Sequence, residues 1–226
     1  DRVLDPGNLV LLWFVYPVVK ALHELGHAYV TRRWGGEVHE IGIMLLVLSP
    51  VPYVDASAAW GFKDKYRRMM VGAAGIAVEL FLGSLALFVW LVVEPGAVRA
   101  IAYNVMLISG VSTLLFNGNP LLRFDGYYVL SDALEIPNLG ARANQYLGYL
   151  AQRYLLRVKD AESPAYTPGE RFWLASYGVA SFIYRIFISF VIILFIAGKF
   201  FVIGVLLAIW AIATQVAFPV GKTVAY

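Results

Sequence analysis

Two histidines and a glutamate lie close together in the middle of an apolar run. The segment reads His23-Glu24-Leu25-Gly26-His27. On a helix, residues four apart lie on one face about one turn apart, so both imidazoles can bind one metal ion. Glu24 lies one residue further round the helix, within reach of a water molecule at that ion. The spacing therefore predicts a metal site with a base beside it.

The surroundings of this segment argue against a chance match. The pattern is HExxH, which places two metal-binding histidines and a general base on one helix of zinc hydrolases. The run that contains it is long and apolar enough to be a membrane span. Ionisable side chains are costly in hydrocarbon, so inside a span each of them is a functional-site hypothesis by default.

Two histidines do not complete a catalytic zinc site, which usually has three protein ligands and an open position for water. Because the chain has no cysteine, the third ligand must be another His, Asp or Glu. The candidates are His39, Glu40, Asp55, Glu79 and Asp125. Asp125 stands out because the Asn-Pro and glycines before it loosen the helix, so its carboxylate can turn back into the bundle. A simple surface turn at Asp125-Gly126 is the alternative.

The composition predicts an integral membrane protein. Of the 226 residues, 60% are hydrophobic and 15% are charged, and the mean hydropathy is +0.70. Soluble domains are about half apolar and about a quarter charged. The absence of cysteine excludes disulfides and thiolate metal sites. The net charge of +3 is small, so we expect contact with the lipid bilayer and no nucleic-acid partner.

The hydropathy pattern predicts an all-α polytopic membrane protein, a single membrane domain over residues 1–226 with at least five transmembrane helices. The predicted spans are Leu9–Tyr29, Met69–Val93, Ala97–Phe116, Phe172–Ala197 and Phe200–Phe218. The last two, within residues 172–218, form a C-terminal pair. The segment Ile41–Tyr53 is apolar, but two prolines break it and it is too short to span twice. It is expected to be a re-entrant or sheet-like element that dips toward the membrane.

The loop charges predict the orientation. Lys and Arg gather between the first and second spans and between the third and fourth, which makes these loops cytoplasmic by the positive-inside rule. Residues 141–160 place Tyr146, Leu150, Tyr154 and Val158 on one face, which predicts an amphipathic helix on the cytoplasmic surface. Two prolines indicate a linker in the segment that follows. We therefore expect the site to face the cytoplasm.

A second motif follows the third predicted span. Asn117 lies three residues before Pro120 and eight before Asp125-Gly126. HExxH on one span, with Asn-x-x-Pro and Asp-Gly at the end of a later one, resembles the site-2 protease family of intramembrane zinc metalloproteases. Two further segments resemble the family's small-residue middle helix and its membrane-dipping strand: Gly72–Gly83 and Ile41–Pro52.

The resemblance covers residues 9–135 and implies a three-helix catalytic core there. Residues 119–139 further resemble bacterial peptide zinc metalloproteases, which are often associated with secretion-type membrane-fusion proteins. Such a membrane-fusion-type subunit, or another transport subunit, would then be a partner. The substrate implied is a membrane-embedded protein or peptide.

The family motif also implies roles for individual residues. His23, His27 and Asp125 would bind Zn²⁺, and Glu24 would be the general base toward water at that ion. Asn117 would donate a hydrogen bond to the oxyanion of the reaction. The alternative for Asn117 is a polar link between helices.

Some residues depart from the family pattern. Arg123-Phe124 stand before Asp125 where an apolar stretch is usual, and Glu79 stands where an asparagine is common. We expect Glu79 to be buried and hydrogen-bonded in a structural role, with Arg185 as its most obvious ion partner. His39 is expected to be an exposed loop residue.

Three functions are compatible with the sequence. The favoured function is a zinc-dependent endopeptidase that cleaves a membrane-bound or exported peptide. The alternatives are a non-proteolytic, zinc-binding membrane subunit of a transport or secretion assembly, and a metal transporter whose intramembrane His and Asp line an ion path. Glu24 discriminates between them, because only the protease needs it.

Overall fold

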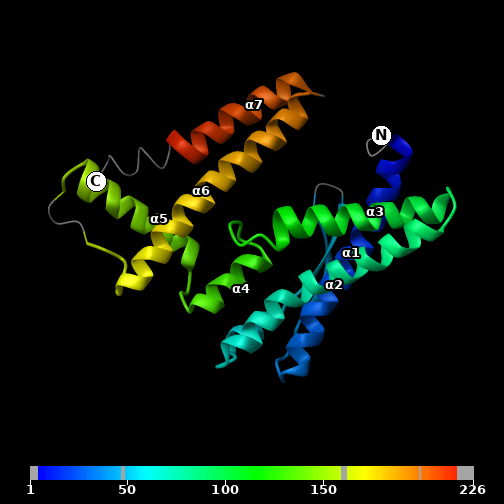
Figure 1. Ribbon diagram of the computed structural model, residues 1–226, viewed down its shortest axis with the longest axis horizontal. Coiled ribbons are helices and arrows are strands. Elements are labelled where there is room, and N and C mark those ends of the chain that lie inside the picture. The colour runs from blue at the N-terminus through cyan, green and yellow to red at the C-terminus, as the bar shows by residue number, and fades with distance from the viewer. Residues whose placement is uncertain (1–4, 47–48, 159–161, 199, 218–226) are drawn as a thin grey trace. The chain divides into compact units, whose positions relative to one another are not determined.

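The computed structural model describes residues 5–46, 49–158, 162–198 and 200–217, and the chain divides after Glu135 into two compact units (Figure 1). The first unit contains α1 (Pro6–Arg33), β1 (Ile41–Leu46), β2 (Ser49–Val54), η1 (Ser57–Gly61), α2 (Lys65–Val92), α3 (Ala97–Val111), η2 (Ser112–Asn117) and α4 (Asp125–Leu134). The second contains α5 (Leu139–Leu150), η3 (Ala151–Leu155), α6 (Pro168–Ala197), α7 (Phe201–Ile212) and η4 (Ala213–Ala217).

Among the described residues, four helices are long and apolar enough to cross a membrane: α1, α2, α3 with η2, and α6. At about 1.5 Å per residue, the shortest of them matches a hydrocarbon core about 30 Å thick. They correspond to four of the five predicted spans. The fifth, Phe200–Phe218, is the shorter helix α7 with the turn η4, and residue 218 lies outside the described residues.

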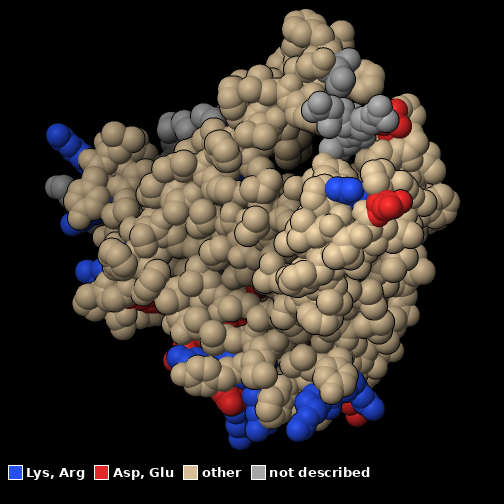
Figure 2. All heavy atoms as spheres, turned by 45° about the vertical axis from the view of Figure 1, so that its right-hand side comes forward, with Lys and Arg blue, Asp and Glu red and all other residues tan. Residues whose placement is uncertain are grey.

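The surface of these helices is largely apolar. Phe14, Phe88 and Leu194 are each more than half exposed. Figure 2 shows a mostly tan surface on which the side chains of Lys, Arg, Asp and Glu are confined to a few places. Exposed apolar surface of this extent suggests association with a membrane.

Helix α2 lies at the centre of the first unit and packs against α1, α3 and α4. Its buried residues include Val71, Ala74, Gly75 and Glu79. Steps of three and four residues place these side chains on one face, as expected for a helix that packs along a single stripe. Asp64 caps this helix, because its Oδ1 accepts a hydrogen bond from the backbone N–H of Tyr66 at 2.9 Å.

The predicted sheet-like element is confirmed as an antiparallel hairpin. Strand β1 pairs with β2 so that Ile41 lies opposite Val54 and Leu46 lies opposite Ser49; residues 47 and 48 lie outside the described residues. Strand β2 packs against α1, whereas most residues of β1 are exposed. The hairpin thus brings Val54 to the helix that carries HExxH.

In the second unit, α5 packs against α6, and α6 packs against α7. The amphipathic helix predicted over residues 141–160 begins slightly earlier, at Leu139, and residues 159 and 160 lie outside the described part of the chain. Tyr146 is buried, whereas Tyr154 is 75% exposed. The helix continues as the π-helical turn η3 and ends at Leu155. Because Arg157 has a positive φ of 56°, Val158 lies outside the helix on which it was predicted.

Candidate metal centre

Three side chains from two helices converge in the first unit. His23 and His27 come from α1, and Asp125 is the first residue of α4. The Nε2 atoms of the two histidines lie 3.0 Å apart. Asp125 Oδ2 lies 3.0 Å from Nε2 of His23 and 3.5 Å from Nε2 of His27. The structure thus brings the three predicted ligands together.

These distances fit a group of ligands around one metal ion. Ligands at about 2.0–2.2 Å from a tetrahedral zinc ion lie about 3.3–3.6 Å from one another. The three ligand atoms are within 4.8 Å of one another, and their observed separations need to change by only a few tenths of an ångström. Two imidazoles and a carboxylate form a donor set that suits zinc and also other divalent transition metals.

The outer ring nitrogen of each histidine has its own partner. His27 Nδ1 lies 2.7 Å from the backbone carbonyl oxygen of Val71, and His23 Nδ1 lies 2.9 Å from Glu79 Oε1. A carbonyl oxygen only accepts, so Nδ1 of His27 carries a proton. The contact of His23 Nδ1 with Glu79 is close but does not have hydrogen-bond geometry. A partner behind the ring is the arrangement that orients metal-binding histidines in known metalloproteins.

Two imidazole nitrogens and one carboxylate oxygen thus face one another. Unprotonated, these atoms repel at hydrogen-bonding distance unless a proton or a cation lies between them. His23 is 4% exposed, so water cannot screen this repulsion fully. The group could hold a metal ion.

Close approach of α1 and α2 depends on Gly75. A Cβ atom at this position would overlap with ring atoms of both His23 and His27. Glycine is the one residue that leaves room for the two imidazoles against the α2 backbone. The small-residue character of the predicted middle helix therefore has a direct steric function here.

Asp125 begins α4 directly after a non-helical segment. Its side chain is 24% exposed. Burial raises the pKa of its carboxyl group, but the adjacent imidazoles of His23 and His27 lower it, and the net result is a pKa below the ordinary value. The N-terminus of a helix also favours a negative charge at this position.

A cavity of about 320 Å³ adjoins the cluster. Its lining includes Glu24, His27, Val54, Trp60, Arg68 and Asp125. Glu24 of α1 and Val54 at the end of β2 line the same space. The predicted base and two predicted ligands therefore face the same space.

The other candidate ligands have different positions. His39 has a 60% exposed side chain and lies 3.6 Å from Glu37 Oε2, as expected for a loop residue. Asp55 lines the cavity but does not belong to the three-residue group, and neither does Glu40. Glu79 is fully buried, as predicted, and contacts His23 through Nδ1 instead of sharing the metal position.

Within the first unit, Glu79 has an ion partner that the sequence did not suggest. Lys20 of α1 forms the ion pair with this carboxylate, and the expected pairing with Arg185, a residue of the second unit, stays a prediction. Lys20 also donates a hydrogen bond to Ser112 Oγ at 2.7 Å. Sequence reasoning missed Lys20, although it is the one cation in its apolar run and lies three residues before His23, on the same helix face.

Asn117 lies in the π-helical turn η2 and is 9% exposed. Its Nδ2 donates hydrogen bonds to Glu79 Oε1 and to Ser112 Oγ, each at 3.2 Å. These contacts match the interhelical link that was the alternative for Asn117. Its role as an oxyanion donor stays a prediction.

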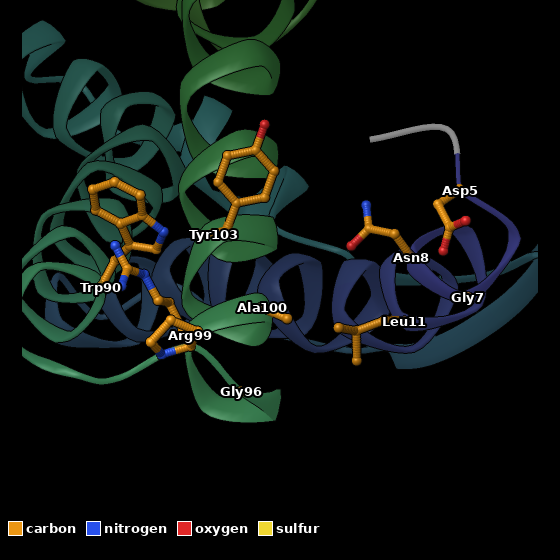
Figure 3. Close-up of a pocket in the computed structure, with 10 residues that line it drawn as sticks. Asp5, Gly7, Asn8, Leu11, Trp90, Gly96, Arg99, Ala100 and Tyr103 are labelled. Carbon is orange, nitrogen blue, oxygen red and sulfur yellow. The ribbon is translucent and has the colours of Figure 1, made fainter. Parts of the chain in front are cut away.

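A second cavity lies at the other end of the three long helices of this unit (Figure 3). It measures about 780 Å³ and is lined by the first residues of α1 and α3 and the last turn of α2. Arg99 stacks on Trp90, with 4.6 Å from its guanidinium carbon to the ring centroid. Along α1, Leu11 in this cavity and Glu24 in the other are about 20 Å apart, so the two spaces are separate.

The chain matches no model of a known protein family, no curated protein and no solved structure.

Proposed function

We propose that the protein is an intramembrane zinc metalloendopeptidase of the site-2 protease type. The observation that carries the proposal is the convergence of His23, His27 and Asp125 beside a cavity that Glu24 also lines. HExxH and the Asp-Gly motif are almost 100 residues apart in the chain, and their meeting supports the idea that both belong to one site. A zinc ion held there would polarise the scissile carbonyl and lower the pKa of water.

The residues of the chain have distinct roles in this proposal. His23, His27 and Asp125 hold the ion, and Glu24 accepts the proton of the attacking water and returns it to the leaving amine. A general base of this kind contributes about 10²–10⁴-fold to the rate. Val54, at the end of β2, lines the cavity beside Glu24.

The hairpin β1–β2 supports a peptide as the substrate. It ends at the cavity, and an extended peptide can pair with a strand through main-chain hydrogen bonds. Trp60 of η1 and Tyr128 of α4 stand at the same cavity, with ring centroids 6.4 Å apart. These rings offer apolar contact to the side chains of a membrane-embedded segment.

The proposal includes the location of the site. We infer that α1, α2 and α3 with η2 span a bacterial cytoplasmic membrane as a three-helix catalytic core, and that α6 and α7 add further spans. The basic residues after α1 and before α2, such as Arg32, Arg33 and Lys63, support an orientation with the HExxH end toward the cytoplasm, by the positive-inside rule.

Zinc content tests the ligand assignment first. Elemental mass spectrometry of detergent-purified protein is expected to find about one zinc per chain in the wild type and in Glu24→Gln, and none in His23→Ala. Glutamine keeps the shape of Glu24 without its basicity, so it leaves the metal in place. A wild type without zinc under metal-replete conditions would show that the ligand assignment is wrong.

Peptide cleavage tests the catalytic assignment. The zinc-loaded wild type and Glu24→Gln are incubated with a library of single-span peptides, and new termini are identified by mass spectrometry. We expect products from the wild type and a rate lower by about 10²–10⁴-fold for Glu24→Gln. Equal zinc in both proteins with no Glu24-dependent product would favour the non-proteolytic subunit instead.

A further inference from the structure

Behind His23 lies a fully buried carboxylate with polar contacts on every side. Glu79 is 0% exposed. Its Oε2 accepts a hydrogen bond from Thr113 Oγ1 at 2.7 Å, and its Oε1 accepts one from Asn117 Nδ2 at 3.2 Å. Lys20 Nζ pairs with the same Oε1. These contacts come from α1 and from the π-helical turn η2.

If the ion pair of Lys20 and Glu79 served only to pack the helices, it would be costly in free energy. Removing two charges from water costs several kcal/mol for each ion, and apolar residues of similar size often serve packing equally well. The chain nevertheless buries a carboxylate and its ammonium partner here. A role that packing alone does not provide would account for this cost.

The position of the His23 ring indicates that role. Its Nδ1 lies 2.9 Å from Glu79 Oε1, and its Nε2 lies 3.0 Å from Asp125 Oδ2. The imidazole thus lies between two carboxylates, one on the metal side and one behind it. A carboxylate behind a metal-binding histidine fixes the ring orientation and its tautomer and increases its strength as a ligand.

The turn η2 makes this arrangement possible. It brings Ser112, Thr113 and Asn117 to the same network, and the N–H of Gly118 reaches back to the carbonyl oxygen of Thr113 at 2.7 Å. Such five-residue turns inside helices occur frequently at functional sites. Lys20, bound to Glu79 and Ser112, ties α1 to this turn.

We propose that Glu79 is a positioning residue of the metal centre: its carboxylate orients His23 through Nδ1, and Lys20 and Thr113 hold the carboxylate in place. This inference rests on the proposed function, because it requires a metal ion on Nε2. It adds a determinant of metal affinity that is outside the HExxH and Asp-Gly motifs. Glu79 does not contact the reacting atoms.

A double substitution distinguishes a positioning role of Glu79 from a purely structural one. Lys20→Met leaves a buried carboxylate without its cation, and Glu79→Gln leaves a buried cation without its carboxylate, so each alone is expected to lower the unfolding temperature. The double variant Lys20→Met/Glu79→Gln removes both charges, and we expect its unfolding temperature to return toward that of the wild type. Its Zn²⁺ dissociation constant, measured by competition with a chromophoric chelator, is expected to rise by about 10–100-fold.

Bound Co²⁺ provides a readout that a structural role would not change. Its visible absorption bands report the ligand geometry, so the double variant is expected to show altered bands at saturating Co²⁺. Ser109→Ala is the matched control, since Ser109 is a buried hydroxyl of α3 whose Oγ has no hydrogen-bond partner within the described chain. This control should keep the wild-type affinity and spectrum.

A milder variant covers the case in which the double variant does not fold. Thr113→Val removes one hydrogen bond to Glu79 without changing any charge, and we expect a few-fold weaker Zn²⁺ affinity with normal folding. The inference is overturned if the double variant folds and keeps the wild-type Zn²⁺ affinity and Co²⁺ spectrum. If only Thr113→Val folds, an unchanged Zn²⁺ affinity in that variant overturns it. Both results leave the proposed function intact, whereas a wild type that binds no metal overturns the proposed function itself.

Discussion

Helices α2 and α6 have nearly the same length and apolar character but differ in what they bury. They contain 28 and 30 residues, and their most apolar windows have mean hydropathies of 2.2 and 2.5. Helix α2 buries Glu79 among its core residues, whereas the buried polar residues of α6 are limited, in the described chain, to Tyr177 and Ser181. Both helices therefore have the length and apolar character of a membrane span. A charged side chain is buried in α2, where residues of other helices contact it.

The same difference holds for glycine at helix contacts. In α2, a Cβ on Gly75 would overlap with the rings of His23 and His27, and in α6 a Cβ on Gly178 would lie 2.9 Å from Leu147 Cδ1 of α5. Both glycines allow close packing. Gly75 of α2 leaves room for two imidazole rings, and Gly178 of α6 leaves room for an aliphatic side chain.

The largest expected effect comes from removing a ligand. Asp125→Ala should lower Zn²⁺ affinity by at least about 100-fold, because only two protein ligands remain. Asp132→Ala on the same helix is the control; its Oδ1 accepts a hydrogen bond from Arg68 Nε at 2.6 Å and is not in the cluster. Elemental analysis after dialysis should find zinc in Asp132→Ala and none in Asp125→Ala. Full zinc in both would remove Asp125 from the ligand set.

The next effect concerns buried charge in the two units. Lys20→Met should destabilise the protein by about 3–5 kcal/mol, because it leaves the Glu79 carboxylate buried without its cation. Arg185→Met in α6 should cost no more than about 1 kcal/mol, because the Arg185 side chain is half-buried and donates one long hydrogen bond, at 3.3 Å, to Ser181. Denaturation in mild detergent compares the two. Equal losses would mean that the charge pair is no more important than an ordinary cation.

Alanine substitutions of Gly75 and Gly178 test the difference between α2 and α6 further. Gly75→Ala and Gly178→Ala are both expected to cost about 1–3 kcal/mol through overpacking. Only Gly75→Ala should also weaken metal binding, because its methyl group displaces both imidazoles. Zinc titration of the two variants checks this, and a normal affinity in Gly75→Ala would contradict the steric role of Gly75 beside the two rings.

The smallest effect should be the same in both units. Asp64 caps α2, and Thr167 caps α6 by accepting a hydrogen bond from the N–H of Glu170 at 3.2 Å. Replacing either residue by alanine should cost about 1 kcal/mol and leave zinc content unchanged. Thermal unfolding with zinc analysis tests this, and zinc loss in Thr167→Ala would link the second unit to the metal centre.

The sequence allowed prediction of features that depend on local spacing. The histidine pair of HExxH follows from helical geometry, and the apolar runs locate the long helices to within a few residues. Asp125 was found through its neighbours in a second motif. The pairing of Lys20 with Glu79 could not be predicted, because 59 residues separate them and helix packing decides which cation reaches the carboxylate. The turn η2 was equally hidden, since five-residue turns lack a strong residue preference.

The two histidines also differ in the kind of group that each contacts. His27 Nδ1 contacts the carbonyl oxygen of Val71, which belongs to the main chain and is present whatever side chain occupies that position. His23 Nδ1 contacts the side chain of Glu79, which a single substitution can replace. Replacing the residue at position 79 would therefore remove the contact of His23, whereas the contact of His27 would persist.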